Sequence, residues 1–334
     1  MDVFHGFAEA RGHLDGCAVA LGNFDGVHLG HQALLGWARD EARRRGQPSV
    51  AATFDPHPGK VLTPELAPKL ISPLWRRLEL LEDFGLDAVI LQPFDRPYAA
   101  LDATQFLSRD LFGLLPSELV VGSDFTYGKS RFGNVESLRE ACESGAVSPP
   151  ALRARGGVRL TVIAPITCDG VVVSSTKIRE FVAEGRVAAA ARLLGRPFEL
   201  SGEVVSGMGR GRGIGFPTAN LASENEVRPA IGVYAVRASL EGRVLFGAAN
   251  IGRKPTFGDA EVTIEVHLFD FEGDLYGKTL AVEFLDRLRG EQRFAGVAAL
   301  KAQIARDCEK AREIARETPP PGPLAPQASR RRGP

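Results

Sequence analysis

The stretch CAVALGNFDGVHLGH, residues 17–31, decides the fold of the first half of the chain. Its five leading residues are apolar and run into Gly22, and apolar side chains then recur at helical spacing up to residue 45. A strand, a glycine turn and a helix therefore follow one another. Further strand–helix pairs, and a last strand, are expected at 48–54 with 74–84, 87–92 with 103–112, 118–122 with 135–142, and 159–166. Strands that alternate with helices predict a doubly wound, Rossmann-like parallel sheet.

The second half of the chain has a different period. After Gly195, apolar and polar residues alternate with a period of two over five segments separated by turn signals, which are 198–205, 232–240, 243–251, 261–269 and 279–288. That pattern predicts an antiparallel β-barrel, followed by one helix at 298–317. We expect an α/β domain at 1–186, a barrel domain at 187–318 and a tail at 319–334 whose Pro- and Arg-containing composition predicts disorder.

Composition narrows the possible partners. The 334 residues carry 41 Lys and Arg against 41 Asp and Glu, so zero net charge disfavours nucleic acid and anionic membranes, despite short arginine runs at 43–45 and 330–332. Four scattered cysteines without a C-x-x-C pair exclude a disulfide scaffold and a zinc ribbon, and we expect buried thiols. The chain shows neither an apolar signal core nor a membrane-spanning stretch, which predicts a cytoplasmic protein.

The first glycine turn carries a candidate phosphate site. Its glycines let the backbone approach a ligand, and His28 and His31 lie one helical turn apart at the positive end of a helix. The other candidate residues of this turn are Gly22, Asn23, Phe24, Asp25, Gly26 and Gly30. The alternative is that the two histidines only cap the helix. The next strand ends in His57-Pro58, so three of the six histidines fall on neighbouring turns, which favours a binding site.

A third element, SSTKIR at 174–179, opens the last helix before the barrel. Hydroxyl groups at a helix N-terminus, with a basic side chain in the first turn, can bind phosphate. The same sequence met alone is more often a simple cap. Together with the histidine pair, Ser174, Ser175, Thr176 and Arg179 predict a further contribution to a phosphate site.

These segments, with GSDFTYG at 122–128, closely resemble the nucleotidyltransferase module of bifunctional prokaryotic riboflavin kinase/FAD synthetases. The second half resembles the kinase module of that family through GRGRGIGFPTANL (209–221), GAANIGRKPTFG (247–258) and the segment 263–294. The resemblance covers about residues 17 to 310. The chain departs from the family pattern in two small ways. Asp55 stands where the family commonly has Glu, and the segment 148–157 is longer than is usual in the family.

The resemblance implies two activities and their substrates. Riboflavin would be phosphorylated by ATP to FMN in the second half, and FMN would be adenylylated by ATP to FAD in the first half, with release of pyrophosphate. It implies nucleotide contacts from the glycine run Gly207, Gly209, Arg210, Gly211 and Gly213, which matches no frame of G-x-G-x-x-G. It implies flavin contacts from His57, Pro58, Asp124 and Phe125 in one module and from Arg289, Glu291 and Phe294 in the other.

Two further residue groups of the kinase half take roles from the resemblance. Thr218 and Asn220 of the corner Pro217-Thr-Ala-Asn offer oxygens that suit Mg²⁺-ATP, although this tetrapeptide alone is more often a simple turn. Glu265 faces away from the apolar row 262, 264, 266 and 268, as a solvated strand carboxylate would. The resemblance instead makes it the base for the ribityl hydroxyl; Glu283, on the next strand, fits that role less well.

The sequence thus predicts a bifunctional transferase that uses Mg²⁺, ATP, riboflavin and FMN, and that is a monomer or a weak homo-oligomer. One alternative is a riboflavin kinase whose first half binds nucleotide without activity, although the intact H-x-G-H and S-S-T-x-x-R patterns argue against it. Another is a flavin-binding or flavin-delivery protein without catalysis.

Overall fold

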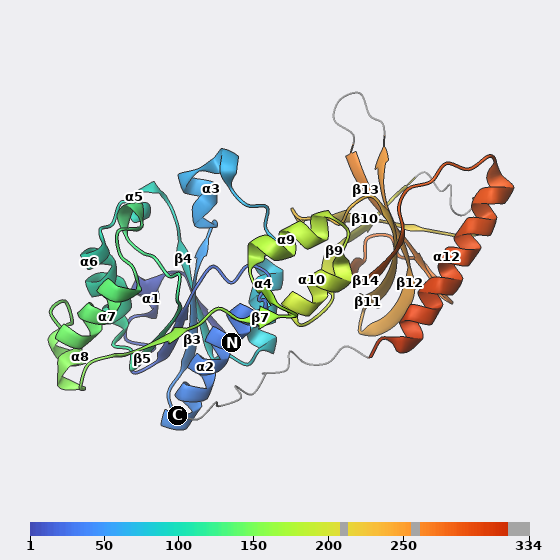
Figure 1. Ribbon diagram of the computed structural model, residues 1–334. Coiled ribbons are helices and arrows are strands. Elements are labelled where there is room, and N and C mark those ends of the chain that lie inside the picture. The colour runs from blue at the N-terminus through green and yellow to red at the C-terminus, as the bar shows by residue number, and fades with distance from the viewer. Residues whose placement is uncertain (208–212, 255–260, 320–334) are drawn as a thin grey trace. The chain divides into compact units, whose positions relative to one another are not determined.

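The computed structural model describes the chain except for residues 208–212, 255–260 and 320–334. The expected nucleotide contacts of Gly209, Arg210 and Gly211, and nearly all of the expected tail, lie outside the described residues. The chain forms two compact units (Figure 1). The first comprises Met1–Lys69 and Leu74–Val173, and the second comprises Leu70–Pro73 together with the described residues from Ser174 onward.

The first unit is built on a parallel sheet of six strands in the order β1-β4-β3-β2-β5-β6. The strands are β1 (Asp2–Phe4), β2 (Ala18–Leu21), β3 (Ser49–Asp55), β4 (Ala88–Pro93), β5 (Glu118–Gly122) and β6 (Arg159–Ile163), and a small hairpin is formed by β7 (Thr167–Cys168) and β8 (Val171–Val172). The predicted doubly wound sheet is confirmed. The edge strand β1 was not expected, because three residues are too short to show a period.

Helices cover both faces of this sheet. One buried cluster joins β2, β3 and β4 to α2 and α4, and another joins the opposite faces of the same strands to α1, η2, η3, α7 and α8. The helical elements are α1 (Phe7–Ala10), α2 (Leu29–Arg45), α3 (Pro58–Leu62), η1 (Pro64–Leu66), α4 (Leu74–Asp83), α5 (Arg96–Ala99), α6 (Ala103–Gln105), η2 (Phe106–Leu111), η3 (Phe112–Leu114), η4 (Lys129–Arg131), α7 (Val135–Ser144) and α8 (Pro150–Ala154). The single helix expected at 103–112 is therefore a succession of three short helical forms.

The strand order places the candidate site. From β2 the chain winds outward to β3 on one side, whereas β5 lies on the other side of β2. The order therefore reverses between β2 and β5, and ligands of open α/β sheets bind beyond the carboxyl ends of the strands at such a reversal. The turns that follow these two strands begin at Gly22 and Gly122, so the histidine turn and the GSDFTYG turn leave the carboxyl ends of adjacent strands.

The second unit is a closed antiparallel barrel in the order β10-β13-β12-β11-β14-β9. Its strands are β9 (Phe198–Val205), β10 (Ala219–Ser223), β11 (Gly232–Leu240), β12 (Arg243–Lys254), β13 (Glu261–Leu268) and β14 (Thr279–Arg289). Phe198, Tyr234 and Phe284 pack ring against ring in its interior. The predicted barrel is confirmed, and β10 is a strand that the period did not reveal, because it is short and begins directly after the Pro217 corner.

Among the residues that the structure describes in this unit, three helices accompany the barrel. Helix α9 (Ser175–Ala183) packs on α10 (Val187–Leu194), which contacts β9 and β14, and α12 (Val297–Glu317) lies along β11, β12 and β14. Within the described residues, every helix is too short or too polar to cross a lipid bilayer.

The cysteines are free thiols, but the expectation that all four are buried is wrong. Cys17 is fully buried at the start of β2, whereas Cys142, Cys168 and Cys308 are half-buried. Burial raises the pKa of the Cys17 thiol to about 12. The difference arises because only Cys17 lies directly before a strand covered on both faces, β2, and packs in the core with it.

Candidate active sites

The turn after β2 is held in an unusual backbone conformation. Phe24 and Val27 have φ angles of 48° and 39°, in the left-handed region that side chains rarely adopt, and Gly26 has a φ of 78°. The Thr53 hydroxyl donates to the Asn23 carbonyl at 3.1 Å, and the Gln32 amide donates to the Val27 carbonyl at 2.8 Å. Such strain persists where neighbouring bonds hold it, and it is concentrated at functional sites.

His28 and His31 stack at the first turn of α2. Their ring centroids lie 3.6 Å apart at an interplanar angle of 15°, and Phe24 meets the His31 ring edge-on at 5.4 Å. The His28 Nδ1 accepts the His31 backbone N–H at 3.2 Å, so His28 is indeed the N-cap of this helix. An Nδ1 that accepts carries no proton, which assigns the proton of the neutral ring to Nε2. Capping and ligand binding are therefore compatible, because the cap leaves Nε2–H as the donor.

Gly22 and Gly30 leave room for these rings. A Cβ on Gly30 would lie 3.1 Å from the His28 ring, and a Cβ on Gly22 would lie 3.1 Å from the Phe24 ring. Both contacts are tighter than ordinary packing, so larger residues would displace the rings that form the turn.

His57, at the end of the neighbouring strand, is also a cap. Its Nδ1 accepts the Gly59 N–H at 3.1 Å, and Pro58 occupies the first position of α3. Close to it lies an aromatic cluster that the sequence reasoning missed: the rings of Phe54, Phe94 and Tyr98 lie within 5.6 to 6.2 Å of one another. Phe54 lies at the carboxyl end of β3 and Phe94 directly follows β4. Two aromatic residues at the ends of expected strands were the sequence signal that could have predicted this cluster.

The turn after β5 carries a second aromatic group. Phe125 and Tyr127 stack at 5.7 Å, and Tyr127 lies 5.7 Å from Phe106. Asp124 is exposed, and its carboxylate oxygen would be 2.9 Å from a Cβ on Gly122. A larger residue at position 122 would therefore have to move the Asp124 side chain.

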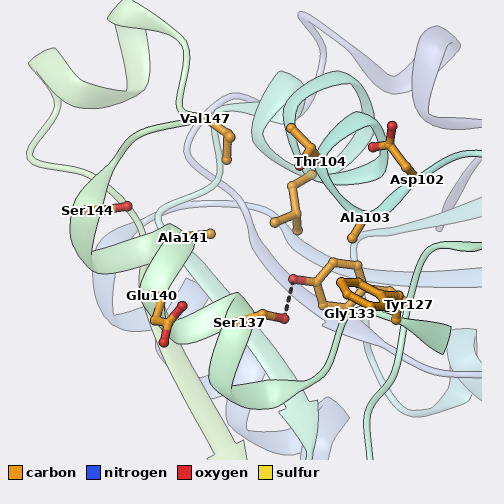
Figure 2. A pocket seen from close by; sticks show the side chains of 12 residues that line it. Asp102, Ala103, Thr104, Tyr127, Gly133, Ser137, Glu140, Ala141, Ser144 and Val147 are labelled. Carbon is orange, nitrogen blue, oxygen red and sulfur yellow. Dashed lines mark hydrogen bonds between the residues drawn. The ribbon is translucent and has the colours of Figure 1, made fainter.

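A pocket of about 470 Å³ opens beside Tyr127, between α6 and α7 (Figure 2). The Tyr127 hydroxyl and the Ser137 hydroxyl share a hydrogen bond of 3.1 Å across it. Its described lining combines apolar side chains with hydroxyl groups and the carboxylates Asp102 and Glu140, and includes no lysine or arginine. This chemistry suits an uncharged ring better than a polyphosphate.

The SSTKIR segment forms the start of α9. The Ser174 hydroxyl caps the helix by accepting the Lys177 N–H at 3.2 Å. Ser175 and Arg179 are half-buried and Thr176 is exposed. Lys177 pairs with Glu180 at 2.6 Å, so its ammonium group is used within the helix.

In the barrel, the register of the strands aligns three polar residues in one row. Two of them were expected from the sequence and the third was not. Glu265 of β13 lies opposite Asn220 of β10 on one side and opposite Asn250 of β12 on the other. Ile264 and Val266, its neighbours along the strand, are buried in the barrel, whereas Glu265 is only half-buried. A carboxylate thus stands between two amides on the outer surface of the barrel. Asn250 was missed by sequence reasoning, since its alignment with Glu265 depends on register.

The Pro-Thr-Ala-Asn corner is held over the same surface. The Pro217 carbonyl lies 2.8 Å from His267 Nδ1, and Phe216 meets the His267 ring edge-on at 5.6 Å. A Cβ on Gly207 would overlap the Asn220 amide, so only glycine permits this approach. Thr218 and Asn220 are both half-buried, and Gly213 is exposed.

The expected flavin residues of the barrel lie at the end of β14 and in the segment between β14 and α12. Arg289 pairs with the buried Asp307 at 2.8 Å and lies over the Phe294 ring at 5.6 Å. Glu291 is exposed. Glu283, by contrast, pairs with Arg237, which is 3% exposed, so its carboxylate has a structural partner.

Comparisons with known proteins cover both units. Residues 10–177 match the FAD synthetase family and residues 194–315 match the riboflavin kinase family. A bifunctional riboflavin kinase/FMN adenylyltransferase of Escherichia coli K12 is 41% identical over 302 residues, which cover 90% of this chain and 93% of the relative. The chain belongs to the family of bifunctional riboflavin kinase/FMN adenylyltransferases. The resemblance inferred from the sequence is thereby confirmed.

Other members of this bifunctional family are comparably similar. The Bacillus subtilis protein is 38% identical over 298 residues, 88% of this chain and 90% of the relative. A solved structure described as a macrolide-efflux protein from Streptococcus pneumoniae superposes with a TM-score of 0.81 at 30% identity, covering 95% of this chain and 99% of that one.

Proposed function

We propose that this chain, as a bifunctional transferase, phosphorylates riboflavin to FMN in its barrel and adenylylates FMN to FAD in its parallel-sheet unit. Family membership across both halves supports both reactions. Two separate polar centres are the main support for assigning one group of residues to each reaction. One is the stacked pair His28 and His31, and the other is the row of Asn220, Glu265 and Asn250.

In the barrel, Glu265 acts as the base. It accepts the proton of the riboflavin 5′-hydroxyl as that oxygen attacks the γ-phosphorus of ATP, and ADP departs. The two amides opposite Glu265 favour this role, because they can orient the carboxylate and the substrate without adding a competing charge. A half-buried position lets the carboxylate meet substrate while the strand holds it in place.

Thr218 and Asn220 are the residues proposed to hold Mg²⁺. Mg²⁺ prefers oxygen ligands and usually takes only one or two from the protein, with substrate phosphates completing its shell. The Thr218 hydroxyl and the amide oxygen of Asn220, which lies opposite Glu265, fit that preference. When bound, the ion neutralises charge on the transferred phosphoryl group. Gly207 and Gly213, with Gly209, Arg210 and Gly211 outside the described residues, are proposed to contact the nucleotide.

In the parallel-sheet unit, a phosphate oxygen of FMN attacks the α-phosphorus of ATP, and pyrophosphate leaves. The FMN phosphate is already anionic, so this step needs no base. His28 donates from Nε2 to the triphosphate, and His31, with the positive end of α2, stabilises charge on the departing pyrophosphate. For Ser174, Ser175, Thr176 and Arg179, at the start of α9 in the second unit, a role as phosphate ligands is proposed from the family resemblance alone. The turn residues Asn23, Asp25 and Gly26 shape the nucleotide site.

The flavin of the adenylylation reaction is proposed to bind beside the aromatic groups at the strand ends. His57, Pro58, Asp124 and Phe125 are the expected contacts, and the cluster around Phe54 offers further aromatic faces. The pocket beside Tyr127, whose ring stacks on Phe125, offers further space lined by apolar side chains, hydroxyl groups and the carboxylates Asp102 and Glu140. In the barrel, Arg289, Glu291 and Phe294 are proposed to contact riboflavin, with Asp307 holding the Arg289 guanidinium in place.

We further propose that the functional domains are 1–186 and 187–318, that the protein works in the cytoplasm, and that it is a monomer or weak homo-oligomer without nucleic-acid or membrane partners. Zero net charge supports the last point.

One incubation tests the function. The purified chain is mixed with riboflavin and Mg²⁺-ATP, and flavins are separated by chromatography over time. Successive appearance of FMN and FAD is expected. FMN without FAD, also when FMN is supplied directly, would favour the kinase with an inactive first half, and unchanged riboflavin would favour a flavin carrier.

A further inference from the structure

Arg77 is a buried cation that neither proposed reaction uses. It lies on α4, and only 3% of the residue is exposed. Arginine remains charged inside proteins, and a buried charge is costly unless it is well paired. The Asp55 carboxylate lies 3.9 Å from the guanidinium, which is a long contact, and the Asp25 carboxylate also acts on its charge. The main partners of Arg77 must therefore be other groups.

Those partners are two backbone carbonyls from two different turns. Nη1 of Arg77 donates to the Asn23 carbonyl at 2.9 Å, and Nη2 donates to the Phe54 carbonyl at 3.4 Å. Asn23 belongs to the turn after β2, and Phe54 lies near the end of β3. One guanidinium thus ties the histidine turn to the neighbouring strand end. Among the described residues, the buried Nε of Arg77 has no hydrogen-bond partner, and its two Nη atoms bond to the two carbonyls.

The bond to Asn23 sets the orientation of a peptide plane. In a trans peptide the carbonyl and the following N–H point in opposite directions. Since Arg77 and the Thr53 hydroxyl both hold the Asn23 carbonyl inward, the Phe24 N–H is turned to the opposite side of the plane. Phe24 is also the residue whose left-handed conformation places its ring against His31. Arg77 therefore acts on the residue that packs against one of the proposed phosphate ligands.

We propose that Arg77 is a positioning residue for FAD formation. It holds the turn between β2 and α2 in the conformation that packs the buried Phe24 ring against His31 and presents the stacked histidines to ATP, without itself touching substrate. The inference rests on the proposed assignment of adenylylation to the parallel-sheet unit. A purely structural arginine would stabilise the unit without changing how ATP is used.

The chain offers a matched control for this distinction. Arg39 on α2 is also buried, at 5% exposed, and donates to the Phe84 carbonyl at 3.0 Å while lying over the Phe84 ring. It belongs to the same unit but bonds to no turn of the candidate site. Arg39 also pairs with Asp40 at 2.9 Å. Arg39→Met and Arg77→Met both remove a buried guanidinium that donates to the backbone, and only the second releases the histidine turn.

The experiment measures FAD formation from FMN over a range of ATP concentrations, with riboflavin phosphorylation by the same preparation as the internal reference. Misplacement of a reacting group by about 1 Å typically costs about 10²-fold. We expect Arg77→Met to lose about that factor in kcat/KM for ATP, Arg77→Lys to recover part of it, and Arg39→Met to keep the wild-type value despite a lowered melting temperature. FMN formation should be unchanged in all three.

Either of two results would overturn the proposal. One is wild-type kinetics of FAD formation in a folded Arg77→Met protein, and the other is an equal loss of kcat/KM for ATP in Arg39→Met and Arg77→Met. If Arg77→Met does not fold, Thr53→Val decides, because it removes the other donor to the same carbonyl; a loss of about fivefold is expected for one hydrogen bond, and unchanged kinetics would refute the inference. A wild-type chain that makes no FAD would refute the proposed function itself.

Discussion

Replacing Glu265 by glutamine should lower the turnover of FMN formation by at least about 10²-fold, because glutamine keeps the size and hydrogen-bonding capacity of the side chain but cannot accept the hydroxyl proton. That factor corresponds to about 2.7 kcal/mol of activation free energy. The effect on folding should be far smaller. Glu265 is half-buried on the outer surface of β13, and substitutions at such surface positions usually change stability by within about 0.5 kcal/mol.

The assay is steady-state FMN formation from riboflavin and Mg²⁺-ATP, with FAD formation from supplied FMN measured on the same sample. The control is Glu203→Gln, because Glu203 is an exposed carboxylate on β9 of the same barrel. Glu283→Gln would be a poor control, since Glu283 pairs with the buried Arg237. A Glu265→Gln protein that retains more than about a tenth of wild-type turnover would refute the assignment of the base, since a general base contributes at least about 10²-fold.

Three further variants test His28, the ion pair of Glu283 with Arg237, and helix α9. His28→Ala should strongly reduce FAD formation and leave FMN formation nearly intact, since His28 lies in the parallel-sheet unit; a parallel fall of both activities in a folded variant would contradict two separate sites. Glu283→Gln should lower the free energy of unfolding by about 3 kcal/mol, measured by urea denaturation, because it leaves Arg237 buried without its carboxylate; an unchanged midpoint would show that the pair is not stabilising. A fragment of residues 187–334 should phosphorylate riboflavin. It should denature at a lower urea concentration than a fragment of residues 174–334, because it lacks α9, which packs on α10. Equal urea midpoints would mean that α9 adds no stability to the barrel.

The repeat of strand and helix was predictable because it is local. The alternation of apolar runs with helical periodicity up to residue 166, and the change to a period of two after Gly195, need only short windows of sequence. The histidine pair was predictable for the same reason, since residues three apart share one face of a helix. The short elements β1 and β10 were missed, because three to five residues carry too little periodicity.

Other features of the two centres depend on pairings between distant parts of the chain. The row of Asn220, Glu265 and Asn250 exists because three strands are aligned in one register, and a shift by one residue would turn Glu265 to the opposite face. The bond from Arg77 to Asn23 joins residues 54 positions apart. The sequence by itself determined which residue types and local elements are present. Only the tertiary structure decided which of them meet, because register and buried polar contacts are set by the packing of the whole unit.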